Sequence, residues 1–175
     1  MTYLERLELM AFFAGYPLLY AIIQLMNGPG KKPTYVVGSL AKLLPFSYAL
    51  SGTLFIGMIV KDLYPYAYSW TSIAQRIYDP FLMVWGVFAV VFWIPAFNKR
   101  PVLSLLHSLV FFFFLGRDVY IRLTSSLGKE IIQNDMKIFT ASLLLNLLCL
   151  ALVVLVYYLL SYRSRLNSSK TATKR

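Results

Sequence analysis

The chain has 175 residues, of which 59% are hydrophobic and 17% aromatic, and its mean hydropathy is +0.65. This apolar content exceeds what a soluble core of this size needs, so we expect an integral membrane protein rather than a soluble one. The single cysteine, Cys149, excludes an internal disulfide. The formal charge of +10 is distributed as in membrane proteins, so we expect no nucleic-acid partner.

The first apolar segment covers residues 9–26 and has Gly15-Tyr16-Pro17 in its middle. A proline inside a helix removes a backbone hydrogen bond, so we expect a kink here. Glu5 and Glu8 precede the segment, where a cleaved signal would carry positive charge. The segment is therefore expected to remain as a membrane span.

The second segment covers residues 36–60, with Lys42 near its start. We expect the Lys42 amine to extend to the membrane surface; the alternative is a place on an internal polar path. Ala49, Thr53 and Gly57 recur every four residues, which favours close packing of another backbone and a helix internal to a bundle. The alternative is that small residues are simply common in membrane helices.

The longest connection, residues 61–79, is rich in aromatic side chains. Apolar residues at helical spacing from Trp70 predict a short helix near residues 69–78 that lies in the interface plane. We interpret the connection as a candidate docking surface for a partner; the alternative is an anchored loop without a partner. Its candidate contact residues are Tyr64, Tyr66, Tyr68, Trp70 and Arg76.

Two further spans follow in close succession. Asp79-Pro80 is typical of a helix start, and residues 80–97 contain no charged side chain. Asn98-Lys99-Arg100 leaves room only for a short reversal before the fourth span, residues 101–123. The third and fourth spans are therefore predicted to form an antiparallel hairpin.

The fourth span contains the only histidine and an Arg-Asp pair. His107 and Asp118 are eleven residues apart, which places them on nearly the same helix face as Phe111. That face is expected to contact protein, because ionisable groups are costly in lipid. The candidate intramembrane polar site comprises His107, Arg117, Asp118, Arg122, Asn146 and Lys42. We expect His107 to be a neutral imidazole that hydrogen-bonds to a neighbouring helix; the alternative is a proton carrier. We expect Arg117 and Asp118 to pair at the headgroup level; the alternative is a gate or binding site.

The fifth span covers residues 138–162, and Asn146 is expected to bond to another helix. The predicted fold is therefore an all-α polytopic transmembrane helical bundle of five spans. Residues 1–162 form one domain, and residues 163–175 form a basic cytoplasmic tail that binds anionic lipids.

Charge distribution predicts the orientation of this bundle. The first and third loops and the tail carry cations but no acid, whereas all seven acidic residues lie on the opposite side. The positive-inside rule then places the N-terminus outside and the C-terminus in the cytoplasm. A bacterial inner membrane is the expected location, because the chain is compact and has no long soluble domain.

The side chains present exclude several chemistries. One histidine and one distant cysteine do not make a metal site, and no glycine loop for phosphate is present. His107 and Asp118 are about 16 Å apart along one helix, which is too far for a serine-hydrolase arrangement. We therefore expect no enzyme activity, no cofactor and no bound metal.

Two functions remain. The first is a non-catalytic membrane subunit or scaffold that binds other membrane proteins, or a second copy of the chain, through aromatic helix faces and the 61–79 loop. The alternative is a small ion or solute transporter that uses a polar path around His107, Arg117 and Asp118. Positions 109–115 are wholly apolar, which favours the first function.

Overall fold

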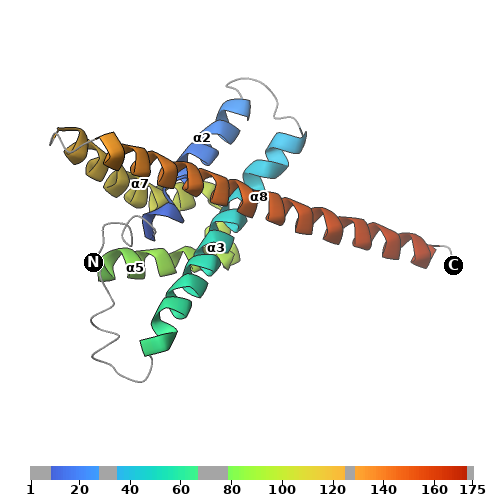
Figure 1. Ribbon diagram of the computed structural model, residues 1–175. Helices are drawn as coiled ribbons and strands as arrows, with labels where there is room; N and C mark the ends of the chain where they lie inside the picture. Colours follow the sequence, from blue (N-terminus) through green and yellow to red (C-terminus); the bar gives the residue numbers. More distant parts are fainter. Residues whose placement is uncertain (1–8, 28–34, 67–78, 125–128, 173–175) are drawn as a thin grey trace.

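The computed structural model describes residues 9–27, 35–66, 79–124 and 129–172, and the elements in these ranges are all helical (Figure 1). In chain order they are α2 (Tyr16–Asn27), α3 (Tyr35–Leu63), the 3-10 helix η1 (Tyr64–Tyr66), α5 (Pro80–Val87), the 3-10 helix η2 (Phe88–Trp93), α6 (Pro95–Asn98), α7 (Pro101–Thr124) and α8 (Lys129–Ala172).

Four of the described segments are long and apolar enough to cross a membrane, which is typical of a multi-pass integral membrane protein. They are Leu9–Met26, Gly38–Tyr66, Pro101–Ile121 and Lys137–Arg163. The third predicted span is represented by a shorter apolar helix, Pro80–Trp93. The interfacial helix predicted near residues 69–78 lies outside the described residues.

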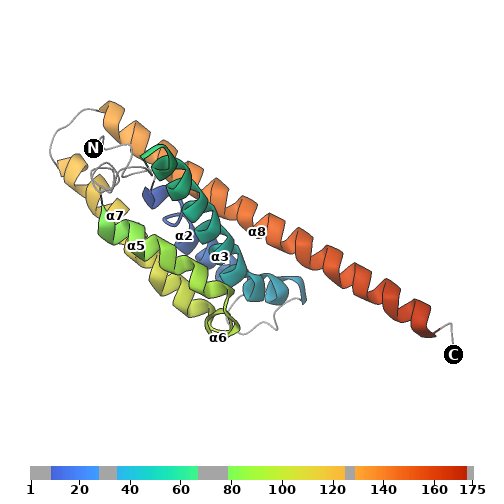
Figure 2. The ribbon, with the colours of Figure 1, turned by 90° about the horizontal axis from the view of Figure 1, so that it is seen from below.

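Helix α3 is the centre of the bundle. It packs against α2, α5, η2, α7 and α8 (Figure 2). The prediction that this helix is internal is confirmed. The Phe13 ring of the first span packs on it, 5.4 Å from the ring of Tyr48 and 5.2 Å from that of Phe55, centroid to centroid.

The predicted stripe of small residues on α3 is wrong beyond its first member. Ala49 is buried, but Thr53 and Gly57 are exposed, and nothing lies within 4 Å of a Cβ built on Gly57. Each four-residue step turns an α-helix by about 40° beyond a full circle, so the spacing drifts away from the packed face. The close approach is instead at Gly52, where a Cβ would lie 2.7 Å from that of Ala89.

The first span is interrupted, as the proline predicted. Residues 9–11 are helical, residues 12–15 form a turn, and α2 begins at Tyr16 with Pro17 in its first turn. A proline is tolerated at that position because its missing N–H would have no partner inside the helix. The break leaves backbone groups of residues 12–15 in need of other partners.

The predicted continuous helix over residues 80–97 is wrong at its end. Ile94 is extended, with φ −74° and ψ 129°, because a residue that precedes proline is forced out of the helical region. The helix therefore stops at Trp93 and restarts as the short α6. Asp79 caps α5 as predicted, with its side chain accepting a hydrogen bond from the Leu82 N–H at 3.1 Å.

Helix α8 is longer than the predicted fifth span at both ends. It begins at Lys129 and continues to Ala172, since no glycine or proline interrupts this stretch. Its C-terminal half extends beyond the other helices (Figures 1 and 2). Only 17% of the apolar window in α8 is buried, against 56% in the first span, so one span is largely uncovered in the described structure.

Candidate functional site

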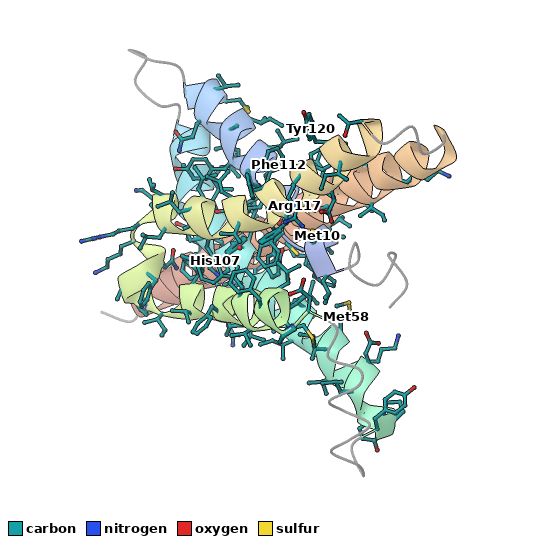
Figure 3. The ribbon with its side chains drawn as sticks, turned by 90° about the vertical axis from the view of Figure 1, so that its left-hand side faces the viewer. Met10, Met58, His107, Phe112, Arg117 and Tyr120 are labelled. Atoms are coloured by element: carbon teal, nitrogen blue, oxygen red, sulfur yellow. The ribbon has the colours of Figure 1, made fainter. Side chains whose placement is uncertain are left out.

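His107 lies in an aromatic cage between α3, α5, η2 and α7 (Figure 3). Its ring stacks on Trp85, with centroids 4.7 Å apart and planes 5° from parallel. Phe92 approaches the imidazole edge-on, at 5.9 Å between ring centroids. The Trp85 indole N–H donates to the His107 carbonyl at 3.1 Å, which ties α5 to α7. The cage thus joins the third and fourth predicted spans as an antiparallel pair.

One imidazole nitrogen has a partner and the other does not. The Tyr48 hydroxyl lies 2.6 Å from His107 Nδ1, whereas Nε2 is buried without a partner among the described residues. Either direction of this bond leaves one donor without an acceptor among the described residues: the Nε2 N–H if the Tyr48 hydroxyl donates to Nδ1, or the Tyr48 O–H if Nδ1 donates to Tyr48. The bond to Tyr48 confirms the expectation that His107 bonds to a neighbouring helix.

A second hydroxyl pair lies next to this cage. The Tyr16 hydroxyl lies 2.7 Å from Ser104 Oγ, and the ring centroids of Tyr16 and Tyr48 are 4.5 Å apart. Tyr16 and Tyr48 are both fully buried, so each hydroxyl needs the partner it has. Together these contacts link α2, α3 and α7 through side chains.

Asn146 and Ser142 of α8 supply partners for the broken first span. The Asn146 amide donates to the Phe12 carbonyl at 3.0 Å and to the Ser142 carbonyl at 2.9 Å. The Gly15 N–H donates to Ser142 Oγ at 2.7 Å. Asn146 was predicted to bond to another helix; its amide N–H instead bonds to the turn of the first span, and from another helix only the Ser51 hydroxyl of α3 reaches it among the described residues, 3.4 Å from Oδ1. Two polar side chains thus satisfy backbone groups that the turn at residues 12–15 would leave unpaired inside the protein.

Replacing Asn146 tests this role. Asn146→Leu keeps most of the side-chain volume but leaves the buried Phe12 carbonyl without its donor. We expect a loss of about 1–2 kcal/mol in the free energy of unfolding, measured by titrating the detergent-solubilised protein with dodecyl sulfate. Ser51→Ala is the matched control, because the Ser51 hydroxyl reaches Asn146 Oδ1 only at 3.4 Å. Equal losses in the two variants would contradict the role of Asn146.

Arg117 and Asp118 are paired near the C-terminal end of α7. Arg117 Nη2 lies 3.3 Å from Asp118 Oδ1, and the Arg117 guanidinium carbon lies 5.2 Å from the centroid of the Phe114 ring. The Arg117 side chain is 44% exposed and that of Asp118 is 10% exposed. On the predicted face, Phe111 and Asp118 are buried and His107 is half-buried, whereas Arg117 is exposed.

The structure does not gather the remaining candidate residues into one site. Lys42 is exposed on α3, in keeping with an amine that reaches the membrane surface. Arg122 lies on α7, but its side chain is outside the described part of the chain. Tyr64 and Tyr66 form η1, with Tyr64 73% exposed. Tyr68, Trp70 and Arg76 lie outside the described residues.

Three polar groupings therefore occur at different places in the bundle. They are centred on His107, on Asn146 and on the Arg117–Asp118 pair. Within the same residues, no three metal-ligating side chains come together. What the arrangement does chemically is to satisfy buried polar groups and to hold helices against each other.

Sequence reasoning missed the partners that complete these groupings. Tyr48, Trp85 and Ser142 each lie on a different helix from the group that they contact. In the sequence, Ser142 is one small polar residue in a long apolar span, and the two aromatic residues are among many others. A buried tyrosine or tryptophan requires a hydrogen-bond partner, but spacing within one helix does not indicate which helix provides it. Comparison of the chain with protein-family models, with curated protein sequences and with solved structures gives no match.

Proposed function

We propose that the protein is a non-catalytic integral membrane subunit, a scaffold that binds another membrane protein along the uncovered part of α8. The observation that supports this function is the exposure of a long apolar helix that the rest of the described chain leaves largely bare. Leu152, Leu155 and Leu159 are each more than half exposed. A partner helix could lie along this face.

The internal polar groups support a scaffold over a transporter. The hydroxyl and amide groups described above bond to one another or to backbone. A solute path needs polar groups through the depth of the membrane, and such groups remain available to the solute. Here the polar groups are used for packing, so the subunit is the better proposal.

We further propose five spans, with the α5–η2 unit as the third. The unit packs antiparallel to α7: Phe81 lies 6.1 Å from Phe114 and Trp85 lies 4.7 Å from His107, centroid to centroid. Its helical rise is about 24 Å, somewhat less than a hydrocarbon core of about 30 Å. With five spans the N-terminus is outside and the basic tail, at the lipid surface, is inside. A bacterial inner membrane remains the proposed location.

Reporters at the two chain ends distinguish five spans from four. Five spans place the ends on opposite sides, whereas four place them on the same side. We expect a reporter before Met1 to be active outside and one after Arg175 to be active in the cytoplasm. A third reporter after Lys99 is expected inside. Both ends on one side would contradict the fifth span.

The binding face on α8 is tested by substitution and purification. We expect the tagged chain, purified in mild detergent from its native membrane, to carry one stoichiometric membrane partner or a second copy of itself. Leu152→Ala, Leu155→Ala and Leu159→Ala combined should release that partner, because a helix interface depends on packed side chains.

Val84→Ala, Val87→Ala and Phe88→Ala combined are the matched control, since these residues are similarly exposed on α5 and η2. The control should retain the partner. Two results together would contradict the subunit proposal and favour transport. The chain would purify without a partner, and it would cause a proton or solute leak in vesicles that Asp118→Asn abolishes.

The same experiment tests the 61–79 loop. If the partner stays bound after all three α8 substitutions, the partner contacts another part of the chain, such as this loop.

A further inference from the structure

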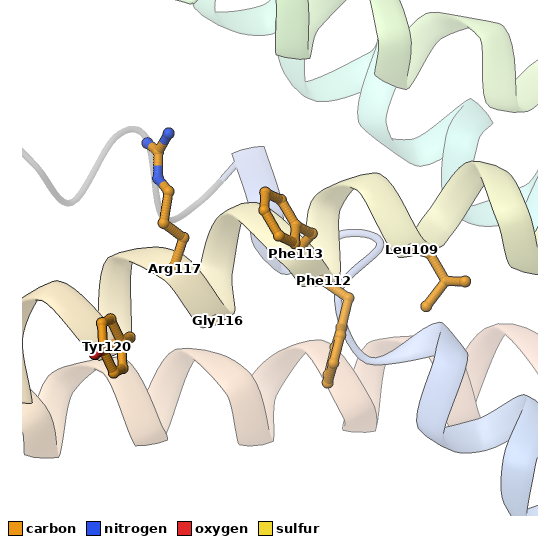
Figure 4. Close-up of a pocket in the computed structure, with 6 residues that line it drawn as sticks. All are labelled: Leu109, Phe112, Phe113, Gly116, Arg117 and Tyr120. Carbon is orange, nitrogen blue, oxygen red and sulfur yellow. The ribbon is translucent and has the colours of Figure 1, made fainter.

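The outer face of α7 has a notch at Gly116. A groove of about 570 Å³ is lined by Leu109, Phe112, Phe113, Gly116, Arg117 and Tyr120 (Figure 4). Nothing lies within 4 Å of a Cβ built on Gly116, so the notch is empty space in a row of large side chains. One wall is backed by α8, because the rings of Phe112 and Phe139 are 6.3 Å apart, centroid to centroid.

The surface of the groove itself is almost wholly apolar. The Arg117 guanidinium lies beside it, 5.2 Å from the Phe114 ring centroid and bonded to Asp118, on a side chain that is 44% exposed. A guanidinium has five N–H donors, and the structure shows one of its nitrogens bonded to Asp118. Its other donors are available to an anion that lies beside the apolar groove.

The depths of Arg117 and Leu109 along the span match those of a lipid headgroup and its acyl chains. The apolar part of α7 is Pro101–Ile121, so Arg117 lies about 6 Å from the end of the span, near the depth of the headgroups. Leu109 lies about 12 Å deeper than Arg117, among the acyl chains. A partner helix would meet the same charge in its own apolar stretch, which is costly, whereas a phospholipid presents an anion at this depth and hydrocarbon below it.

We propose that this groove binds one anionic glycerophospholipid. The phosphate pairs with the Arg117 guanidinium, for which a bidentate contact is favourable, and one acyl chain lies over Gly116 against Phe112 and Phe113. This site differs from the basic tail, which would attract lipid headgroups by charge without a groove. The proposal does not depend on a protein partner.

The test counts bound lipids by native mass spectrometry. Purified chain in detergent micelles is titrated with palmitoyl-oleoyl-phosphatidylglycerol and, separately, with dioleoylglycerol, which has acyl chains but no phosphate. We expect one tightly bound phosphatidylglycerol and no comparable binding of dioleoylglycerol. Arg117→Gln should weaken the binding about five-fold. Gly116→Leu should abolish it, because the leucine side chain occupies the notch, where a Cβ meets no atom within 4 Å.

Gly57→Leu on α3 is the matched control, since Gly57 is also exposed with nothing within 4 Å of its Cβ position. It should bind lipid like the wild type, and no variant should melt at a lower temperature than the wild type. Equal lipid binding in wild type, Gly116→Leu and Arg117→Gln would overturn the proposal. Loss of a protein partner or of a second copy in Gly116→Leu, with lipid binding unchanged, would also overturn it, because the notch would then seat a helix.

Discussion

Gly15→Ala is expected to separate the first span from α8 and to cost about 3 kcal/mol or more of the free energy of unfolding. A Cβ at this position would lie 2.5 Å from the Leu143 nitrogen and 2.7 Å from the Leu143 Cα. These are backbone atoms, which cannot rotate out of the way, so the two segments must move apart. The movement would also break the bond from the Gly15 N–H to Ser142 Oγ. Dodecyl sulfate titration of the purified variant measures the loss.

Gly57→Ala is the matched control for this change. Its Cβ meets nothing within 4 Å, so the only effect is the higher helix propensity of alanine. We expect this variant to be as stable as the wild type or up to about 1 kcal/mol more stable. If Gly15→Ala and Gly57→Ala unfolded at the same dodecyl sulfate fraction, the close contact between residue 15 and α8 would be wrong.

His107→Ala should be similarly damaging, because it removes a ring that fills the space between Trp85 and Tyr48. Deleting a buried ring leaves a cavity, and we expect a loss of about 3 kcal/mol in the free energy of unfolding. His107→Phe keeps the stack on Trp85 and should lose only about 1 kcal/mol, from the unpaired Tyr48 hydroxyl. Melting temperature in detergent and dodecyl sulfate titration both report the difference.

A double substitution separates packing from hydrogen bonding in the cage. Tyr48→Phe alone leaves His107 Nδ1 without its partner and should cost about 1 kcal/mol. His107→Phe combined with Tyr48→Phe removes both polar groups, including the unpartnered Nε2, and should return close to wild-type stability. Strictly additive losses in the double variant would mean that the 2.6 Å contact between Tyr48 and His107 contributes no coupling.

The residues that ended or interrupted helices could be identified from their own chemistry. Pro17 predicted a break in the first span, and Asp79-Pro80 predicted the start of α5. Pro95 could have predicted the end of the helix at residue 93, since it forces Ile94 out of the helical region. The third span was nevertheless predicted to continue through it. Each of these effects acts on the neighbouring peptide units, so it can be judged without a fold.

The sequence predicted that the polar residues would bond to other helices, but it did not predict their partners. Asn146 and His107 were expected to bond across to other helices because lipid offers them no partner. Their partners, Phe12 and Tyr48, come from segments far away in the chain. The Arg-Asp pair was predicted at the membrane surface. The groove beside its exposed arginine could not be predicted, because it depends on how α7 packs against α8.

Local chemistry in the chain therefore established the class of protein, the positions of the apolar helices and the sites of their breaks, because hydropathy and proline geometry act over a few residues. The three-dimensional packing decided which glycines allow contact, with Gly15 and Gly52 close-packed and Gly57 and Gly116 open. It also decided that α3 is the centre and that α8 is largely uncovered. These outcomes depend on which helix faces meet, and a helix specifies its own faces but not the neighbour that each of them contacts.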